Sequence, residues 1–165
     1  MNAWYAVHTQ ALGELKALPH LARQGFDAYL PRYLKRRRHA RRTDWVAAPL
    51  FPRYLFVNMD PDAVRWRAIN STVGVSYLVC NGERPVPLPQ SVIEDIRARE
   101  DAAGMVTVRP LGEMKKGDRI HIVDGALGER DAVFDCYTDD QRVTVLMEIL
   151  GRQVKVHVAA EALGA

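Results

Sequence analysis

The segment that most constrains the fold is FPRYLFV at residues 51–57, which is apolar on both sides of any strand it forms. Side chains alternate along a strand, so Tyr54 and Phe56 share one face while Leu55 and Val57 share the other. One of these faces must pack into the core. The other face is either buried as well, as in a central strand, or exposed as an apolar docking patch. The pattern alone leaves both open.

Turn signals and periodicity predict further elements around this segment. Strands are predicted at 3–8, 27–34, 46–57 and 73–79, helices at 10–24, from Asp60 to about Asn70 and at 91–101, and a loop at 80–90. Pro19 predicts a kink or a shortening of the first helix, and Ser91 with Glu94 predicts a capping box for the last. This order predicts an α+β fold over residues 1–101, with helices packed on one face of a small antiparallel sheet.

The pattern changes after residue 101, and residues 102–114 are interpreted as a linker. Beyond it, the segments RIHIV, DAVFDCY, RVTVLMEIL and RQVKVHV alternate or are rich in β-branched residues, which predicts a small β-barrel over 115–165. Gly125, Gly128 and Gly151 favour this barrel over helices, because each glycine costs a helix about 1 kcal/mol relative to alanine. A helical arrangement stays open if an apolar domain interface stabilises it.

Charge changes sign along the chain. Residues 1–100 hold 15 basic and 9 acidic side chains, a net of +6, whereas residues 101–165 hold 8 and 11, a net of −3. Six cations crowd one predicted hairpin tip: Lys35, Arg36, Arg37, Arg38, Arg41 and Arg42. We expect them to contact a nucleic-acid backbone, although a solvated loop is the alternative. Lys16, His20 and Arg23 form a stripe on the first helix, for which periodicity alone favours an ordinary solvent face.

Several classes of protein find no support in the sequence. The five histidines, at positions 8, 20, 39, 121 and 157, show no metal-binding spacing, and Cys80 and Cys136 are too far apart for a paired motif. No nucleophile elbow or phosphate-binding loop is present, so we expect neither an enzyme nor a cofactor. The opening MNAWYAVHT lacks a signal-peptide pattern, and no apolar run is long enough to span a membrane. We therefore expect a cytoplasmic monomer.

Four ordered segments resemble the NusG family of bacterial transcription elongation factors. They are WYAVHT at 4–9, PLFPRYLFV at 49–57, NSTVGVSYLV at 70–79 and KKGDRIHIVDGALGE at 115–129. The first three are similar to the family's N-terminal NGN domain, and the last, with VLMEILGRQVKV at 145–156, is similar to its KOW barrel. HLARQGFDAYLP at 20–31 is closer to the specialised RfaH-like paralogue than to general NusG.

The resemblance implies a factor that binds the clamp helices of RNA polymerase, suppresses pausing and associates with the nucleoid through the polymerase. The residues implied in polymerase binding are Trp4, Tyr5, Phe51, Tyr54 and Phe56. The RfaH-like branch implies recognition of non-template DNA, and therefore of particular operons, through the first helix. The matching residues are His20, Arg23 and Gln24, with Lys16 on the same stripe.

The KOW resemblance implies that Ile149, Leu150 and Arg152 bind ribosomal protein S10. The RfaH-like branch is also known to fold this domain as a helical hairpin. Ala48 stands where that branch has an acid that joins its two domains, which favours the barrel here. The alternatives are a general NusG-type factor that also engages Rho, and an RNA- or ribosome-binding KOW protein.

Overall fold

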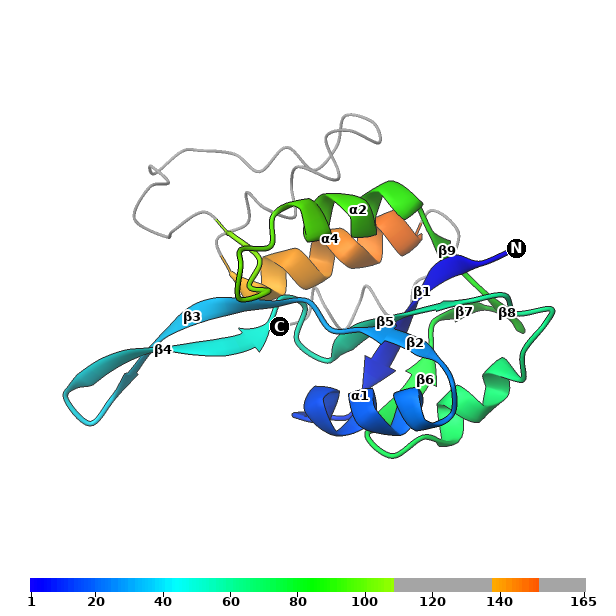
Figure 1. The fold of residues 1–165 in the computed structure, drawn as a ribbon, viewed down its shortest axis with the longest axis horizontal. Helices are drawn as coiled ribbons and strands as arrows, with labels where there is room; N and C mark the ends of the chain where they lie inside the picture. Colours follow the sequence, from blue (N-terminus) through cyan, green and yellow to red (C-terminus); the bar gives the residue numbers. More distant parts are fainter. Residues whose placement is uncertain (109–137, 152–165) are drawn as a thin grey trace.

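An antiparallel sheet forms the centre of the computed structural model, which describes residues 1–108 and 138–151. Strand β1 (Ala3–Thr9) lies between β5 (Tyr54–Met59) and β6 (Val75–Leu78), and β2 (Asp27–Tyr29) pairs with the outer edge of β5 (Figure 1). The short strand β9 (Pro87–Leu88) pairs with the beginning of β1. β5 is therefore an interior strand, and both of its apolar faces are buried.

Helices cover both faces of this sheet. Helix α1 (Glu14–Arg23) and the 3-10 helix η1 (Trp66–Ser71) pack Leu21 and Ile69 against the face that carries Leu55 and Val57. Helices α2 (Gln90–Ala98) and α4 (Asp139–Gly151) cover the opposite face, which carries Tyr54 and Phe56 (Figure 1). The expectation of helices on one face only is wrong, because an apolar face left open on β5 would expose large side chains to water.

A two-stranded hairpin projects away from the sheet (Figure 1). It consists of β3 (Arg32–His39) and β4 (Arg42–Pro49), with Ala40 and Arg41 at its tip. Both tip residues have positive φ, 47° and 68°, which is the backbone of the two-residue turn that matches strand twist. The single strand expected at 27–34 is thus two strands, because the chain leaves the central sheet at Pro31.

Three smaller expectations also need correction. The helix expected from Asp60 is a turn followed by the short helix η1, although Asp60 Oδ1 does accept a bond from the Asp62 amide at 3.0 Å. Helix α2 begins one residue before Ser91, so the expected capping box does not form. The loop expected at 80–90 contains β9 and the two-residue strands β7 (Cys80–Asn81) and β8 (Arg84–Pro85).

The largest correction concerns residues 142–150, where a barrel strand was expected and helix α4 is found. Thr138 and Gln141 form a reciprocal cap at its beginning: the Gln141 amide donates to Thr138 Oγ1 at 3.2 Å, and the Thr138 amide donates to Gln141 Oε1 at 3.1 Å. Gly151 is the last residue of α4, where its helix penalty is small. The other expected barrel strands, and residues 109–114 of the expected linker, lie outside the described residues.

The α4 segment carries two periodicities at once. Val143, Val145, Met147 and Ile149 alternate as in a strand, whereas positions 142, 145, 146, 149 and 150 follow the spacing of one helix face. All five residues of the second set are buried. Burial of a large apolar side chain is worth about 1.5–3 kcal/mol, which exceeds the few tenths that a β-branched residue costs a helix. Packing against the sheet therefore decides in favour of the helix.

Candidate interaction surfaces

An aromatic patch made of Trp4, Phe51, Tyr54 and Phe56 lies on the sheet face beneath α2 and α4. The rings of Phe51 and Phe56 meet edge to face, with centroids 5.7 Å apart. Tyr54 is only 4% exposed, and its hydroxyl lies 3.6 Å from the Met147 sulfur of α4. Four aromatic side chains thus converge on one face, and α4 covers the ring of Tyr54.

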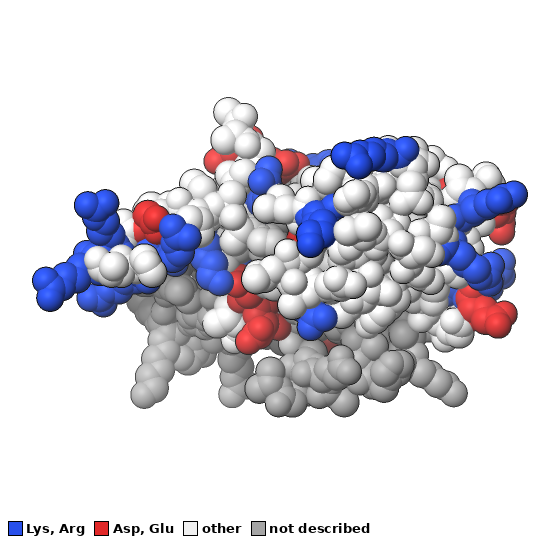
Figure 2. Space-filling model, turned by 90° about the horizontal axis from the view of Figure 1, so that it is seen from below, with Lys and Arg blue, Asp and Glu red and all other residues white. Residues whose placement is uncertain are grey.

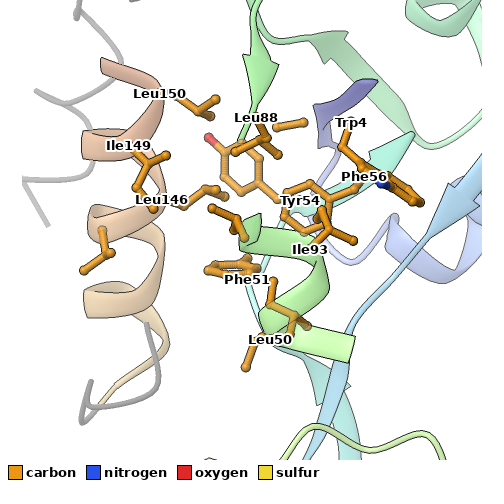
Figure 3. Close-up of a cluster of buried hydrophobic side chains, with 14 of the residues drawn as sticks. Trp4, Leu50, Phe51, Tyr54, Phe56, Leu88, Ile93, Leu146, Ile149 and Leu150 are labelled. Atoms are coloured by element: carbon orange, nitrogen blue, oxygen red, sulfur yellow. The ribbon is translucent and has the colours of Figure 1, made fainter. Parts of the chain in front are cut away.

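The contact between the patch and α4 is apolar at its centre. Figure 3 shows Leu146, Ile149 and Leu150 projecting from α4 toward Tyr54, with Trp4 on the side of the cluster farther from α4. Leu50 and Leu88 belong to the same apolar surface against which α4 packs. These two leucines were not singled out in the sequence; the signal available for Leu50 was its place next to Phe51 in the apolar segment 49–57. The centre of this contact has the composition of a domain core.

A group of polar residues, here called the Asp139 network, fixes the first turn of α4 to the hairpin. Lys35 Nζ donates to Asp139 Oδ2 at 2.6 Å, and the Tyr33 hydroxyl donates to Asp139 Oδ1. Arg142, which is 2% exposed, pairs with the same carboxylate and donates through Nε to the Leu50 carbonyl at 2.8 Å. The guanidinium also lies 4.6 Å from the Tyr33 ring centroid. The buried charge of Arg142 is thus both paired and hydrogen-bonded.

Asp139 also affects the ionisation of Tyr33. Burial and the hydrogen bond to the Asp139 carboxylate raise the pKa of Tyr33 to about 12, against a smaller lowering by Arg142. Asp139 brings a carboxylate from α4 to Tyr33 and Lys35 of β3. The hairpin therefore has a polar contact with α4 although Ala48 itself carries no acid.

The structure separates one residue from the expected polymerase-binding set. Trp4, Phe51, Tyr54 and Phe56 share a cluster, but Tyr5 packs on the opposite face of the sheet with Leu55 and Val57. Trp4 and Tyr5 are neighbours in β1, and neighbouring side chains of a strand point to opposite faces. Tyr5 is therefore a core residue beneath α1, and its assignment to the patch is wrong.

Helix α1 carries the residues expected to contact DNA. Lys16 and Arg23 are exposed and His20 is half-buried, on the side of the sheet opposite to α4. Gln24 has a structural contact: its amide nitrogen donates to the His20 carbonyl at 3.1 Å and to Thr72 Oγ1 at 2.8 Å. Pro19 lies within the helix, which is shorter than the expected 10–24.

The expected basic tip is a basic hairpin. Only Arg41 is at the turn; Lys35, Arg36, Arg37 and Arg38 lie along β3, and Arg42 begins β4. Figure 2 shows Lys and Arg side chains gathered on this projection. Arg37 pairs with Asp44 across the hairpin at 2.9 Å. The hairpin is thus a positively charged projection with one internal ion pair.

Ile149 and Leu150, expected at an exposed barrel rim, are instead buried on the face of α4 that packs against the sheet. They are not available to a ribosomal protein in this arrangement. Arg152 lies outside the described residues. Within the part of the chain that the structure describes, no group of three or more metal-ligating side chains is found. The described helices include none long and apolar enough to cross a membrane.

The family model described as transcription termination factor nusG matches residues 2–97. These residues include β1, the hairpin, β5 and most of α2. The chain belongs to the NusG family. The family model describes transcription factors rather than enzymes.

Relatives of the chain carry the name transcription termination/antitermination protein NusG. The protein of Thermus thermophilus is 27% identical over 94% of this chain and 94% of its own length. Those of Deinococcus radiodurans and Staphylococcus aureus are 28% and 25% identical, over 68% and 94% of this chain and 66% and 91% of their own lengths. A solved structure titled "Domain interaction in Thermotoga maritima NusG" aligns over 73% of this chain and 70% of that chain at 19% identity, with a TM-score of 0.38, too low to carry an argument.

Proposed function

We propose that this NusG-family protein is a transcription elongation and antitermination factor that docks on the clamp helices of RNA polymerase through the aromatic patch. The observation that carries the proposal is the convergence of Phe51, Tyr54 and Phe56 on one sheet face beneath a separate helix. Large aromatic side chains at the centre of an interface supply much of its binding energy. Suppression of pausing would follow from holding the clamp in one conformation.

In the described arrangement α4 occupies this patch, so the same surface cannot bind α4 and the polymerase together. The proposed activity therefore includes a release step in which α4 leaves Tyr54. Release would also free Ile149 and Leu150, which the resemblance assigns to ribosomal protein S10. The alternating residues of 143–149 could then pair as a strand of the expected KOW barrel.

Non-template DNA is the proposed second partner. Lys16, Arg23 and the hairpin cations are exposed while α4 is in place. DNA contact can therefore precede release, which suits a factor recruited at particular operons. A general NusG-type factor that engages Rho is the alternative, and dependence on a defined DNA element distinguishes the two.

The test of docking uses single substitutions of Tyr54, because Phe56 is wholly buried and its loss would disturb the fold. In an Asp139→Ala background, in which we expect the docking of α4 to be weakened, Tyr54→Ser should weaken binding to RNA polymerase roughly 30-fold or more. Tyr54→Phe is the matched control, and it should bind nearly as well because it keeps the ring. Equal binding by Tyr54→Ser, with an unchanged thermal midpoint, would show that the patch is not the docking surface.

The DNA proposal is tested by comparing helix and hairpin variants. Arg38→Gln should weaken binding to all sequences alike and reduce the dependence of log K on log salt by about one unit. His20→Ala should instead reduce the preference between DNA sequences. A His20→Ala protein that keeps its full preference would remove α1 from sequence recognition.

A further inference from the structure

The basic hairpin has two chemically different faces. Directly paired residues of antiparallel strands share a face, and the faces alternate along each strand. Lys35 pairs with Val46 and Arg37 with Asp44, so these four side chains share the face that carries Tyr33. Tyr33 and Lys35 both contact Asp139, so this face is turned toward α4.

The other face is built from three consecutive pairs: Leu34 with Ala47, Arg36 with Trp45, and Arg38 with Thr43. Trp45 is 63% exposed and Leu34 is 49% exposed, and both arginines are exposed as well. We call this surface the Trp45 face. It presents a flat apolar ring with a guanidinium directly opposite and a second one two residues along β3.

Carboxylates divide the cations of the two faces. On the face turned toward α4, Asp44 pairs with Arg37 and Asp139 pairs with Lys35. The positive charges of these two cations are therefore neutralised by neighbouring carboxylates. The three pairs of the Trp45 face contain no acidic residue. Among the residues that the structure describes, the positive charge of the hairpin is therefore least compensated around Trp45.

Most of the Trp45 surface is exposed, so the ring adds little apolar burial to the fold. An aromatic ring beside uncompensated arginines has the chemistry that holds single-stranded nucleic acid: the ring stacks on a base and the cations contact the backbone. A paired base in a duplex cannot offer its face to the ring. An acidic protein surface would satisfy the arginines but would not need the ring.

We propose that Trp45 is a base-stacking site for single-stranded DNA, with Arg36 and Arg38 contacting the flanking phosphates. The proposal deepens the function proposed above and rests on its DNA contact. It assigns to the hairpin a preference for unpaired over paired DNA, which a purely electrostatic projection would not have.

The experiment measures binding of the full-length protein to a fluorescein-labelled 12-nucleotide DNA strand and to a duplex of the same sequence. Trp45→Leu, which keeps an apolar side chain without the ring system, should weaken single-strand binding roughly 5- to 100-fold and change duplex binding little. Trp45→Phe is the matched control, and it should retain most of the affinity. The salt dependence should be unchanged in Trp45→Leu and reduced in Arg38→Gln.

The outcomes separate this inference from the function on which it rests. If wild type binds the single strand and Trp45→Leu binds it equally well, the stacking site is wrong while the DNA contact stands. If Trp45→Leu and Trp45→Phe weaken binding to the single strand and to the duplex alike, the ring has no stacking role. If wild type binds neither form of DNA, both the stacking site and the DNA contact are overturned. The same conclusion follows if wild type binds an RNA strand or an acidic protein far more tightly than DNA. A thermal midpoint matching wild type confirms that each variant is folded.

Discussion

Gly74 shows how one residue sets the distance between α1 and the sheet. Its φ is +88°, and a Cβ at this position would lie 2.8 Å from the Gly13 carbonyl oxygen and 2.9 Å from the Ala17 amide nitrogen. Both neighbours are backbone atoms and cannot rotate away. The Gln10 amide also donates to the Gly74 carbonyl at 2.8 Å. The helix that carries the proposed DNA contacts therefore depends on the absence of a side chain here.

Replacement of this glycine should be costly. We expect Gly74→Ala to lower the free energy of unfolding by about 3 kcal/mol or more, because it combines a clash with a left-handed backbone. The control is Gly82→Ala, which has φ +62° and no atom within 4 Å of the added Cβ, and it should cost about 1 kcal/mol. Urea unfolding followed by circular dichroism measures both. Equal losses would contradict the close packing of α1.

Tyr33 gives a residue-scale prediction about pH. Its pKa is raised to about 12 from an ordinary value of 10, first by burial and then by the Asp139 carboxylate, so the folded state favours the protonated phenol. The stability from this preference is complete below about pH 10 and is lost as pH rises through 12. The difference in absorbance at 295 nm between wild type and Tyr33→Phe should therefore have a midpoint near pH 12. Asp139→Asn should lower this midpoint, and an unchanged midpoint would show that the carboxylate does not act on Tyr33.

At the scale of elements, α4 depends on Asp139 in a way that its neighbour Asp140 does not. Both aspartates lie in the first turn, where a negative charge is favourable to a helix. Of the two aspartates, it is Asp139 whose carboxylate contacts Tyr33, Lys35 and Arg142. The docking of the helix and its local charge preference can therefore be separated by substituting one or the other.

We expect Asp139→Ala to weaken the docking of α4 by about 3 kcal/mol, because it leaves the buried guanidinium of Arg142 without its carboxylate. Amide hydrogen exchange in 142–150 should then be roughly 100-fold faster. Asp140→Ala should accelerate exchange only about twofold, through the lost helix-dipole interaction. Asp139→Ala combined with Arg142→Met should recover part of the docking. Similar exchange in the two single variants would remove the Asp139 network as the anchor.

At the scale of the whole molecule, the proposed polymerase-binding surface is covered, whereas the proposed DNA-binding surfaces are exposed. The aromatic patch is buried beneath α4, whereas the exposed faces of α1 and the hairpin are open to a partner (Figures 1 and 2). The sheet lies between α4 and α1. A change in the docking of α4 should therefore act on one partner and largely spare the other.

This separation predicts the behaviour of the full-length protein toward its two partners. Asp139→Ala should tighten binding to RNA polymerase by about tenfold or more, because the patch no longer has to be uncovered first. The affinity for single-stranded DNA should change by less than about threefold. A small increase is expected, because Lys35 no longer pairs with the carboxylate of Asp139. Fluorescence anisotropy with each partner measures both. An unchanged polymerase affinity, with hydrogen exchange showing that α4 is released, would contradict occlusion of the patch.

The sequence alone was sufficient for the features that depend on local pattern. The alternation in 51–57 predicted a strand with two apolar faces but left open whether the second face was buried, and the motifs at 4–9, 49–57 and 70–79 indicated the family. The exposure of Lys16, Arg23 and the hairpin cations also agrees with expectation, because charged side chains on amphipathic elements stay in water. Their partners remain predictions.

Where the sequence fits a strand and a helix almost equally well, only the tertiary structure decided between them. Residues 142–150 satisfy a strand period and a helix period, and intrinsic propensities separate the two by little. Burial of Leu146, Ile149 and Leu150 against Tyr54 selects the helix, and that contact joins residues about 90 positions apart. The same holds for Tyr5: the sequence places it beside Trp4, but the pleat of β1 and the helices on each face determine that it packs beneath α1.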